Sequence, residues 1–276
     1  MTNKQQTQHA TLPSFVKTIW QFYQENGRSF SWRHVDDPYK VVVSEIMLQQ
    51  TQTQRVAQKY PEFVARFSSF KDLGQASLRD VLTYWQGLGY NRRGKYLHEI
   101  AQKVMSEYDG KLPQSPELLA TFPGIGQATA SSICAFAFNM PTVFIETNIR
   151  TVFIHHFFKG KTNIKDADIM PLVRATVDEE KARDWYYALM DYGVMLKKST
   201  PNPSRRSAHH TQQSKFEGSD RQIRGIVLRL LTEFSSLSLS NFLTLIDKDA
   251  QRIEKILFDL CSEKLILRSG DHFLIQ

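Results

Sequence analysis

Apolar residues recur at helical spacing through residues 12–198. An α-helix makes one turn in about 3.6 residues, so apolar side chains three and four positions apart share one face. Runs with this spacing are Phe15, Ile19, Phe22; Val81, Leu82, Trp85; and Ile149, Val152, Phe153, Phe157. The alternation of apolar and polar residues that is typical of strands is scarce here. The pattern therefore predicts an all-α domain over residues 12–198.

Residues 215–276 follow a different pattern. Two runs predict amphipathic helices, namely Ile223, Ile226, Val227, Leu230, Leu231, Phe234 and Ile253, Ile256, Leu257, Leu260, Cys261. Between them we expect Ser240 to cap a short helix. Residues 265–275, which are apolar on both sides of Ser269-Gly270-Asp271, predict a β-hairpin. Three helices followed by a hairpin indicate a small winged-helix-like α+β domain in a chain that is mainly α.

Residues 199–214 separate the two patterns and are predicted to form a linker. The stretch from Ser199 to Ser207 is rich in Ser, Pro and Arg and poor in apolar residues. This composition suits a solvated connector, and its arginines also suit a loop that contacts phosphates.

Composition narrows the class of protein. A chain of 276 residues with 41% hydrophobic and 23% charged residues allows two packed domains and excludes wholesale disorder. No apolar stretch approaches the ~18 residues of a transmembrane helix, and the first ten residues lack the apolar core of a signal peptide. We therefore expect a cytoplasmic protein with no membrane partner. The two cysteines, Cys134 and Cys261, exclude a disulfide framework and a four-cysteine metal site, and we expect no metal.

The net charge of +7 favours a polyanionic partner. The whole excess lies in residues 1–214, because residues 215–276 carry nine basic and nine acidic side chains. The neutrality of the C-terminal segment argues against strong binding of a polyanion by this segment alone. It favours a contact with a protein partner or a bracing role for the helical domain.

A short glycine motif is the first of three segments with candidate chemistry. Phe122-Pro123-Gly124-Ile125-Gly126 lies between two helical patterns. Its glycines allow a tight turn, and the amides at the start of the following helix could hold a phosphate. The alternative is an ordinary helical corner that packs tightly through glycine.

The other two segments place an acid in an apolar run. Glu45 is expected at a helix start among apolar residues, which would raise its pKa and suit a general acid; the alternative is a first-turn glutamate favoured by the helix dipole. Glu146 precedes a predicted helix, where it could instead serve only as a cap, as could Thr147 or Asn148. One neutral and one ionised carboxylate are what glycosidic-bond cleavage through an oxocarbenium-like state requires.

Together these segments resemble the helix–hairpin–helix DNA glycosylase superfamily, and within it the MutY-like adenine glycosylases. The similarity extends from about Gly27 to about Leu196. The matching segments are Gly27-Arg28…Trp32, Pro38-Tyr39-Lys40-Val41, the run from Ser44 to Gln52, Gly87-Leu88-Gly89-Tyr90, the glycine motif, Glu146-Thr147-Asn148-Ile149-Arg150 and Met190-Asp191-Tyr192-Gly193.

The resemblance implies a two-lobed enzyme of base excision repair. It would flip a mispaired adenine, opposite guanine or 8-oxoguanine, out of duplex DNA and hydrolyse its N-glycosidic bond. Glu45 would protonate the departing base, Glu146 would stabilise the sugar cation, and Asn148 would lie in the pocket. Ala128 stands where bifunctional relatives such as endonuclease III carry a Schiff-base lysine, which implies a monofunctional enzyme. Such an enzyme would be associated with the nucleoid.

The resemblance and the charge pattern also predict the DNA contacts. Tyr90 would wedge into the duplex, and the glycine motif would hold a phosphate, with a monovalent cation on its carbonyls. Arg92 and Arg93 adjoin the wedge and are candidates for phosphate contacts. The full set of predicted DNA-binding residues is Gln49, Gln50, Tyr90, Arg92, Arg93, Pro123, Gly124, Ile125, Gly126, Gln127, Lys197 and Lys198.

The chain departs from the family at three places. The position of Glu146 is normally an aspartate, and one more methylene moves a carboxylate by about 1 Å. The family's four iron–sulfur cysteines after Leu196 are absent, so no cluster is expected, and Lys197, Lys198, Arg205 and Arg206 are candidates to replace the DNA contact of that loop. The C-terminal segment is too short and too helical for the β-rich domain that recognises 8-oxoguanine. Two alternatives therefore stay open, namely excision of another base (uracil or thymine in mismatches, or an alkylated purine) and a non-catalytic protein that binds DNA lesions.

Overall fold

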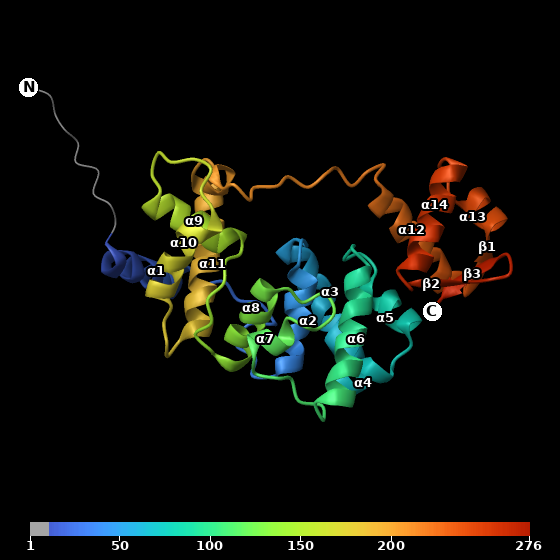
Figure 1. Ribbon diagram of the computed structural model, residues 1–276, viewed down its shortest axis with the longest axis horizontal. Helices are drawn as coiled ribbons and strands as arrows, with labels where there is room; N and C mark the ends of the chain where they lie inside the picture. The colour runs from blue at the N-terminus through green and yellow to red at the C-terminus, as the bar shows by residue number, and fades with distance from the viewer. Residues whose placement is uncertain (1–10) are drawn as a thin grey trace, which may run out of the picture. The chain divides into compact units, whose positions relative to one another are not determined.

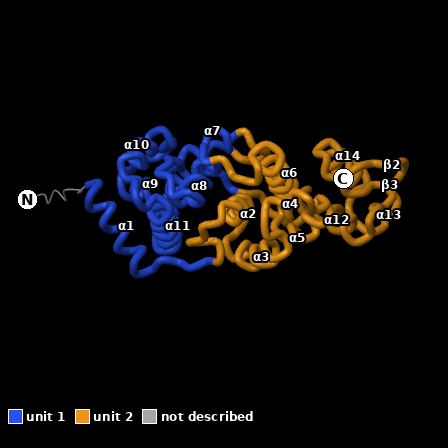
Figure 2. Tube along the Cα trace, turned by 90° about the horizontal axis from the view of Figure 1, so that it is seen from below, with its two compact units in different colours: residues 1–30, 114–120, 126–212 blue, residues 31–113, 121–125, 213–276 orange. Residues whose placement is uncertain are grey.

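The computed structural model describes residues 11–276 and divides into two compact units (Figures 1 and 2). Unit 1 comprises residues up to 30, 114–120 and 126–212, and unit 2 comprises residues 31–113, 121–125 and 213–276. The first ten residues, on which the expectation about export rests, lie outside the described residues. None of the described helices is long and apolar enough to cross a membrane.

Unit 1 is all-helical, as the apolar pattern predicts. Its elements are α1 (Leu12–Asn26), α7 (Pro116–Leu119), α8 (Gln127–Phe138), α9 (Thr147–Phe157), α10 (Asp166–Thr176), α11 (Ala182–Ser199) and the 3₁₀ helix η1 (Pro203–Arg206). Helix α11 packs against α1, α8 and α9 (Figure 1). Phe15 of α1 lies in the resulting core, with its ring centroid 5.1 Å from that of Phe153 and 6.1 Å from that of Trp185.

Most of the predicted linker, residues 199–212, is part of unit 1. Arg206 donates hydrogen bonds to the carbonyls of Ile154 (3.0 Å) and Phe158 (2.6 Å), at the C-terminal end of α9. Ser207 pairs with Ile164 in a parallel bridge, and Ser204 is buried. The prediction of a solvated connector is wrong here, because Arg206 stabilises the last carbonyls of α9 and folds the segment onto it.

Unit 2 contains a second group of helices followed by the C-terminal segment. Its elements are α2 (Pro38–Leu48), α3 (Thr53–Arg66), α4 (Phe70–Gln75), α5 (Leu78–Trp85), α6 (Arg92–Glu107), α12 (Asp220–Phe234), β1 (Ser236–Ser238), α13 (Leu239–Leu245), α14 (Ala250–Ser262), β2 (Ile266–Ser269) and β3 (His272–Ile275). Helix α6 packs against α2, α4 and α5.

The C-terminal segment has the predicted three helices and hairpin, with one more strand. The antiparallel sheet has the order β1-β3-β2, and Leu237 of β1 pairs with Phe273 of β3. The helix α13 is capped by Ser238, whose hydroxyl accepts from the amide of Asn241 at 3.2 Å, so the prediction that Ser240 is the cap is wrong. The winged-helix-like architecture is confirmed.

The C-terminal segment shares one apolar core with α5. Leu78 and Leu82 of α5 are buried in the same cluster as Ile223 and Val227 of α12. Beside them Arg79 donates to Thr232 O at 2.6 Å and to Ser235 Oγ at 2.7 Å, and Gln86 donates to the Thr232 hydroxyl at 2.6 Å. The prediction of a separate domain over residues 215–276 therefore differs from the observed packing. The segment packs on α5 and braces it.

Candidate active site and DNA interface

Glu45 lies close to the C-terminal end of α2, where its side chain is half-buried. The helix begins at Pro38 and is capped by Asp37, whose carboxylate accepts from the Tyr39 amide at 3.0 Å. The prediction that Glu45 stands at a helix start is therefore wrong. The helix dipole disfavours a carboxylate at this end, so the dipole gives no structural reason for an acid here.

Arg93 fixes the end of the helix that carries Glu45. Its side chain is only 7% exposed, and burial lowers its pKa to about 10. The guanidinium donates to Ile46 O at 2.8 Å, Met47 O at 2.9 Å and Gln49 O at 2.5 Å, and also to Thr51 Oγ1 at 2.9 Å, Leu88 O at 3.0 Å and Gly89 O at 3.1 Å. These bonds tie the end of α2 to the loop before Tyr90. The predicted phosphate contact of Arg93 is revised accordingly, because both of its terminal nitrogens donate to backbone carbonyls or to the Thr51 hydroxyl.

Tyr90 stands in a constrained loop between α5 and α6. Its φ is 46°, in the left-handed region, and the neighbouring Gly87 and Gly89 have φ values of 89° and 70°. A tyrosine in this conformation carries backbone strain, which structures retain mainly at functional sites. Its hydroxyl accepts a hydrogen bond from Arg221 at 2.7 Å. The loop thus presents the predicted wedge residue, and the C-terminal segment holds it.

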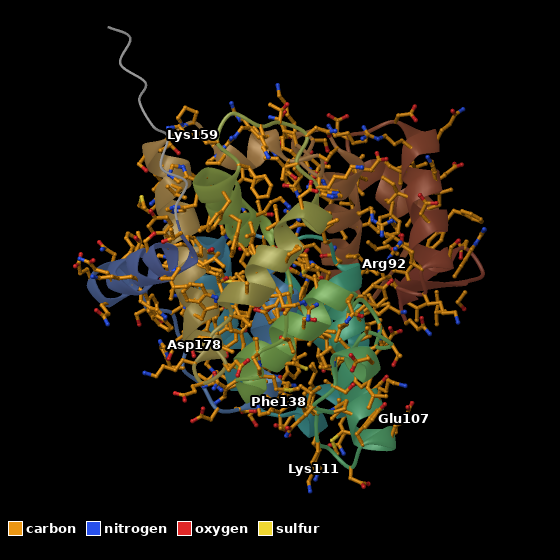
Figure 3. The ribbon with its side chains drawn as sticks, turned by 60° about the vertical axis from the view of Figure 1, so that its left-hand side comes forward. Arg92, Glu107, Lys111, Phe138, Lys159 and Asp178 are labelled. Atoms are coloured by element: carbon orange, nitrogen blue, oxygen red, sulfur yellow. The ribbon has the colours of Figure 1, made fainter. Side chains whose placement is uncertain are left out.

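Five predicted DNA-binding residues line one pocket of about 390 Å³ in unit 2. The lining residues are Gln49, Gln50, Tyr90, Asn91, Arg92, Arg93 and Tyr96, together with Arg221, Arg224 and Glu263 from the C-terminal segment. Glu263 forms ion pairs with both Arg92 and Arg224, and Figure 3 shows Arg92 beside the C-terminal helices.

The sequence interpretation missed the three C-terminal residues of this pocket. The net charge of residues 215–276, taken as a whole, hides two arginines that stand three positions apart on one face of α12. The helical spacing of Arg221 and Arg224 was the signal that could have revealed them.

The glycine motif forms a tight turn next to α6. Gly124 has φ 70°, and a Cβ there would lie 2.4 Å from the ring of Tyr96, so only glycine fits. Gln49 donates to Gly124 O at 3.3 Å, which connects the end of α2 to the turn. Ile125 is buried, whereas Gly126 and Gln127 are exposed. The sequence left open a helical corner that packs tightly through glycine, and Gly124 shows this tight packing.

Gly126, the last residue of the glycine motif, stands at the start of a helix and provides no side-chain cap. Gly126 is the N-cap of α8 and, as a glycine, makes no side-chain cap hydrogen bond. An uncapped helix start offers amide donors and a positive dipole end to an anion. The predicted phosphate site therefore keeps the chemistry it needs.

Glu146 is the N-cap of α9 in unit 1. Its Oε1 accepts from the amides of Asn148 (2.7 Å) and Ile149 (2.9 Å), and its Oε2 accepts from the Asn148 side-chain amide at 3.2 Å. The cap role was the structural alternative, and it is present. The extra methylene relative to aspartate is taken up by folding the side chain back onto the helix start, so the charge stays at the N-terminus of α9.

Lys197 lies beside this group and not on an exposed surface. Its ammonium donates to Asn148 Oδ1 at 2.7 Å. Burial lowers the pKa of Lys197, and the charge of Glu146 opposes that effect. Because Oδ1 faces the ammonium, the amide nitrogen of Asn148 faces Glu146. The predicted DNA contact of Lys197 is therefore revised to a place in the Glu146 site, whereas Lys198 is exposed.

Gly193 allows α11 to approach α9 at this point. A Cβ on Gly193 would lie 2.6 Å from Asn148 O and 2.8 Å from Asn148 Cβ. Two residues earlier, buried Asp191 accepts from the amide and the Nε of Arg28, both at 2.7 Å. Close packing between helices therefore places Lys197 and Asn148 within hydrogen-bond distance.

The described residues do not fit an iron–sulfur cluster. Residues 11–276 contain no group of three or more Cys, His, Asp or Glu side chains suited to a metal ion. Cys134 is buried in α8 of unit 1 and Cys261 belongs to unit 2. Where the family resemblance would place the cluster, the chain has Lys197 at the Glu146 site and Arg206 at the end of α9.

Comparisons with known proteins agree with this arrangement. Residues 43–172 match the family model described as HhH-GPD superfamily base excision DNA repair protein. An adenine DNA glycosylase from Mycobacterium tuberculosis is 30% identical over 91% of this chain and 89% of its own length. An adenine DNA glycosylase from Buchnera aphidicola is 33% identical over 66% of this chain, which spans about half (52%) of that relative.

Three further similarities concern another base or the fold. A thymine/uracil-DNA glycosylase from Methanothermobacter thermautotrophicus is 28% identical over 66% of this chain and 84% of its own length. The solved structure of a thermostable thymine-DNA glycosylase is 25% identical, with a TM-score of 0.59 over 67% of this chain and 86% of that chain. An endonuclease III–DNA complex shares the fold, with 12% identity and a TM-score of 0.55 over 66% of this chain and 85% of that chain.

Proposed function

Since this chain belongs to the HhH-GPD superfamily of base excision DNA repair proteins, on its adenine glycosylase branch, we propose that it excises mispaired adenine from duplex DNA. The reaction is hydrolysis of the N-glycosidic bond of an adenine that is opposite guanine or 8-oxoguanine and flipped out of the helix. The observation that carries the proposal is the carboxylate of Glu146, which three N–H donors fix at the start of α9.

The two acids have different tasks in this reaction. Glu45 donates its proton to the departing adenine, so that the electrons of the C1′–N9 bond leave with the base. Glu146 stabilises the positive charge that develops on the sugar, and Asn148 and Lys197 hold its surroundings. A water molecule then adds to C1′ and returns a proton to Glu45.

The enzyme is proposed to be monofunctional. Position 128, in the first turn of α8, carries an exposed alanine that cannot form an imine with the abasic sugar. Duplex DNA with a mispaired or damaged base is the proposed partner, and the cytoplasm with its nucleoid is the proposed location. We also propose that the carbonyls of the glycine motif hold a monovalent cation and that the enzyme requires no other cofactor.

Base release from a set of duplexes tests the proposal. Each duplex carries one adenine opposite guanine, 8-oxoguanine, cytosine, adenine or thymine, and the released base is measured by chromatography. We expect release of adenine from the guanine or 8-oxoguanine duplex, with the DNA strand left intact until alkali is added. Binding to these duplexes with no released adenine would refute it.

A second candidate is a thymine or uracil glycosylase for mismatches with guanine. The similarity to the two thymine-directed enzymes favours it, because it is comparable in extent to the similarity to the adenine glycosylases. Duplexes with thymine or uracil opposite guanine separate the two candidates. Release of pyrimidine without adenine would establish the second.

A further inference from the structure

The winged-helix-like segment supplies part of the pocket around Tyr90. Arg221 and Arg224 lie on α12 and line this pocket together with Arg92 of α6. We propose that this composite pocket binds a phosphodiester of duplex DNA, so that the C-terminal segment is part of the DNA interface. The proposal rests on the proposed function for its DNA partner, and it assigns the neutral C-terminal segment a direct contact with DNA.

The charge of the pocket lining is the first argument. Four arginines, Arg92, Arg93, Arg221 and Arg224, line the pocket together with one carboxylate, that of Glu263. Burial opposes ionisation of Glu263, but hydrogen bonds from Arg92 and Arg224 outweigh burial and lower its pKa. The lining therefore has three more positive than negative charges, and a phosphodiester is the anion that a polyanionic partner brings.

The contacts of Arg221 are the second argument. Its guanidinium donates to the Tyr90 hydroxyl at 2.7 Å and to Ser214 O at 2.6 Å, and it makes no ion pair with a carboxylate in residues 11–276. Its Cζ lies 5.3 Å from the centroid of the Tyr90 ring. Gln213 also donates to the Tyr90 hydroxyl. The Arg221 guanidinium is therefore held by neutral partners, and no carboxylate among residues 11–276 neutralises its charge, so it can pair with an anionic ligand.

The rigidity of the attachment is the third argument. The apolar core that joins α12 to Leu78 and Leu82, and the hydrogen bonds from Arg79 to Thr232 and Ser235, hold α12 against α5. The pocket arginines therefore need no domain movement to stand beside Tyr90. Amide side chains of Gln50 and Asn91 line the same pocket and could contact a sugar or a base edge next to the phosphate.

The test compares full-length Arg221→Met with Arg229→Met. Arg229 lies on the same helix, is exposed, pairs with Glu233 at 3.3 Å and does not line the pocket. Because each variant replaces an arginine by methionine, both lose one positive charge. Affinity for a labelled, undamaged duplex is measured by fluorescence anisotropy at several salt concentrations. We expect the Kd of Arg221→Met to rise about 5–10-fold near 0.1 M salt and its salt slope to fall by about one. Arg229→Met should change Kd less than about 2-fold.

Arg221→Lys and melting temperatures guard against misfolding. Arg221→Lys keeps the charge and should recover most of the affinity, while all three variants should unfold cooperatively. Equal Kd values and salt slopes for Arg221→Met and Arg229→Met would overturn the proposal. A second result would also overturn it. Inorganic phosphate would raise the melting temperature of the wild type but not that of Arg221→Met, while Arg221→Met bound the duplex as tightly as the wild type. The pocket would then hold a small anion.

The outcomes also separate this inference from the proposed function. An undamaged duplex reports binding without turnover. If the wild type releases no adenine but Arg221→Met weakens duplex binding, the glycosylase proposal fails and the pocket assignment stands. If the wild type releases adenine and Arg221→Met binds like Arg229→Met, the reverse holds.

Discussion

The two proposed catalytic carboxylates stand at opposite ends of their helices. Glu45 lies near the C-terminal end of α2, where the helix dipole disfavours negative charge, and its neighbours Ser44, Ile46 and Met47 are buried. Glu146 is the N-cap of α9, where the dipole favours negative charge and three N–H donors bind the carboxylate. Two glutamates can therefore have different roles, because one lies near a helix C-terminus among buried residues and the other is bound by amides at a helix N-terminus.

The two helix ends are also held by different means. Arg93 binds the last carbonyls of α2 from outside the helix, whereas Glu146 itself binds the first amides of α9. Glu146 therefore supplies both a charge and a cap, and substitutions there can remove one and keep the other, while a change at Glu45 leaves the hydrogen bonds from Arg93 to its helix in place.

Replacement of Glu45 should have the largest effect. Glu45→Gln keeps the shape of the side chain but cannot give a proton to the departing base, so we expect adenine release to fall by about 10³-fold or more. Single-turnover rates at saturating duplex measure this, and the Kd for the duplex should change little. Substantial turnover by Glu45→Gln would remove Glu45 from the proposed acid role.

Replacement of Glu146 should have the second largest effect. Glu146→Gln can still accept hydrogen bonds from the α9 amides but has lost the charge, so we expect a fall of about 10²-fold in the single-turnover rate with nearly unchanged stability. Glu146→Asp keeps both charge and cap and should remain within about 10-fold of the wild type. If Glu146→Gln is as active as Glu146→Asp, Glu146 is only a helix cap.

The comparison also shows what the sequence could and could not reveal. Helical spacing predicted the helical nature of residues 12–198, and the apolar run and the hairpin residues predicted the winged-helix-like architecture, because these features depend on local patterns. The position of Glu45 in its helix was wrong, since Asp37 and Pro38 start α2 earlier than the apolar run suggested. Glu146 at a helix start was correct, because the polar residues 146–148 mark that boundary.

Contacts between distant residues escaped the sequence interpretation. Arg93, as a neighbour of the wedge, and Lys197 and Arg206, as replacements for the cluster loop, were all candidates for contacts with DNA. In the structure each guanidinium or ammonium binds carbonyl or amide oxygens of another element. The sequence alone does not distinguish a basic side chain that faces DNA from one that caps a helix. Only packing, such as the close approach that Gly193 allows, separates the two uses.

Removal of the Lys197 ammonium should have a smaller effect than loss of either acid. Lys197→Met leaves Asn148 Oδ1 without its ammonium donor, so the amide that faces Glu146 loses its fixed orientation. We expect the single-turnover rate to fall about 10-fold with less than a 2-fold change in duplex Kd, and Lys197→Arg to restore part of the rate. Exposed Lys198 is the matched control, because Lys198→Met should weaken binding and leave the saturated rate unchanged. Weaker binding and a normal rate in Lys197→Met would return Lys197 to the DNA contacts.

The smallest expected effect concerns His156, near the far end of the helix that Glu146 begins. Burial, with a smaller effect of His155, lowers the pKa of His156 from 6.5 to about 4, and its Nε2 is buried without a hydrogen-bond partner among the described residues. Below pH 6.5 the unfolded chain therefore takes up a proton that the folded ring refuses. The free energy of unfolding should fall between pH 6.5 and 4 by about 2 kcal/mol, with allowance for solvent at the half-buried ring.

Urea unfolding of His156→Phe measures this contribution. The ring already lies among Phe15, Phe157 and Tyr192, with centroids 5.1, 6.3 and 5.5 Å away, so phenylalanine suits the site. We expect the variant to lose less stability than the wild type between pH 6.5 and 4, and His210→Gln, at an exposed histidine, is the matched control. Parallel curves for wild type and His156→Phe would show that the ring is not kept neutral.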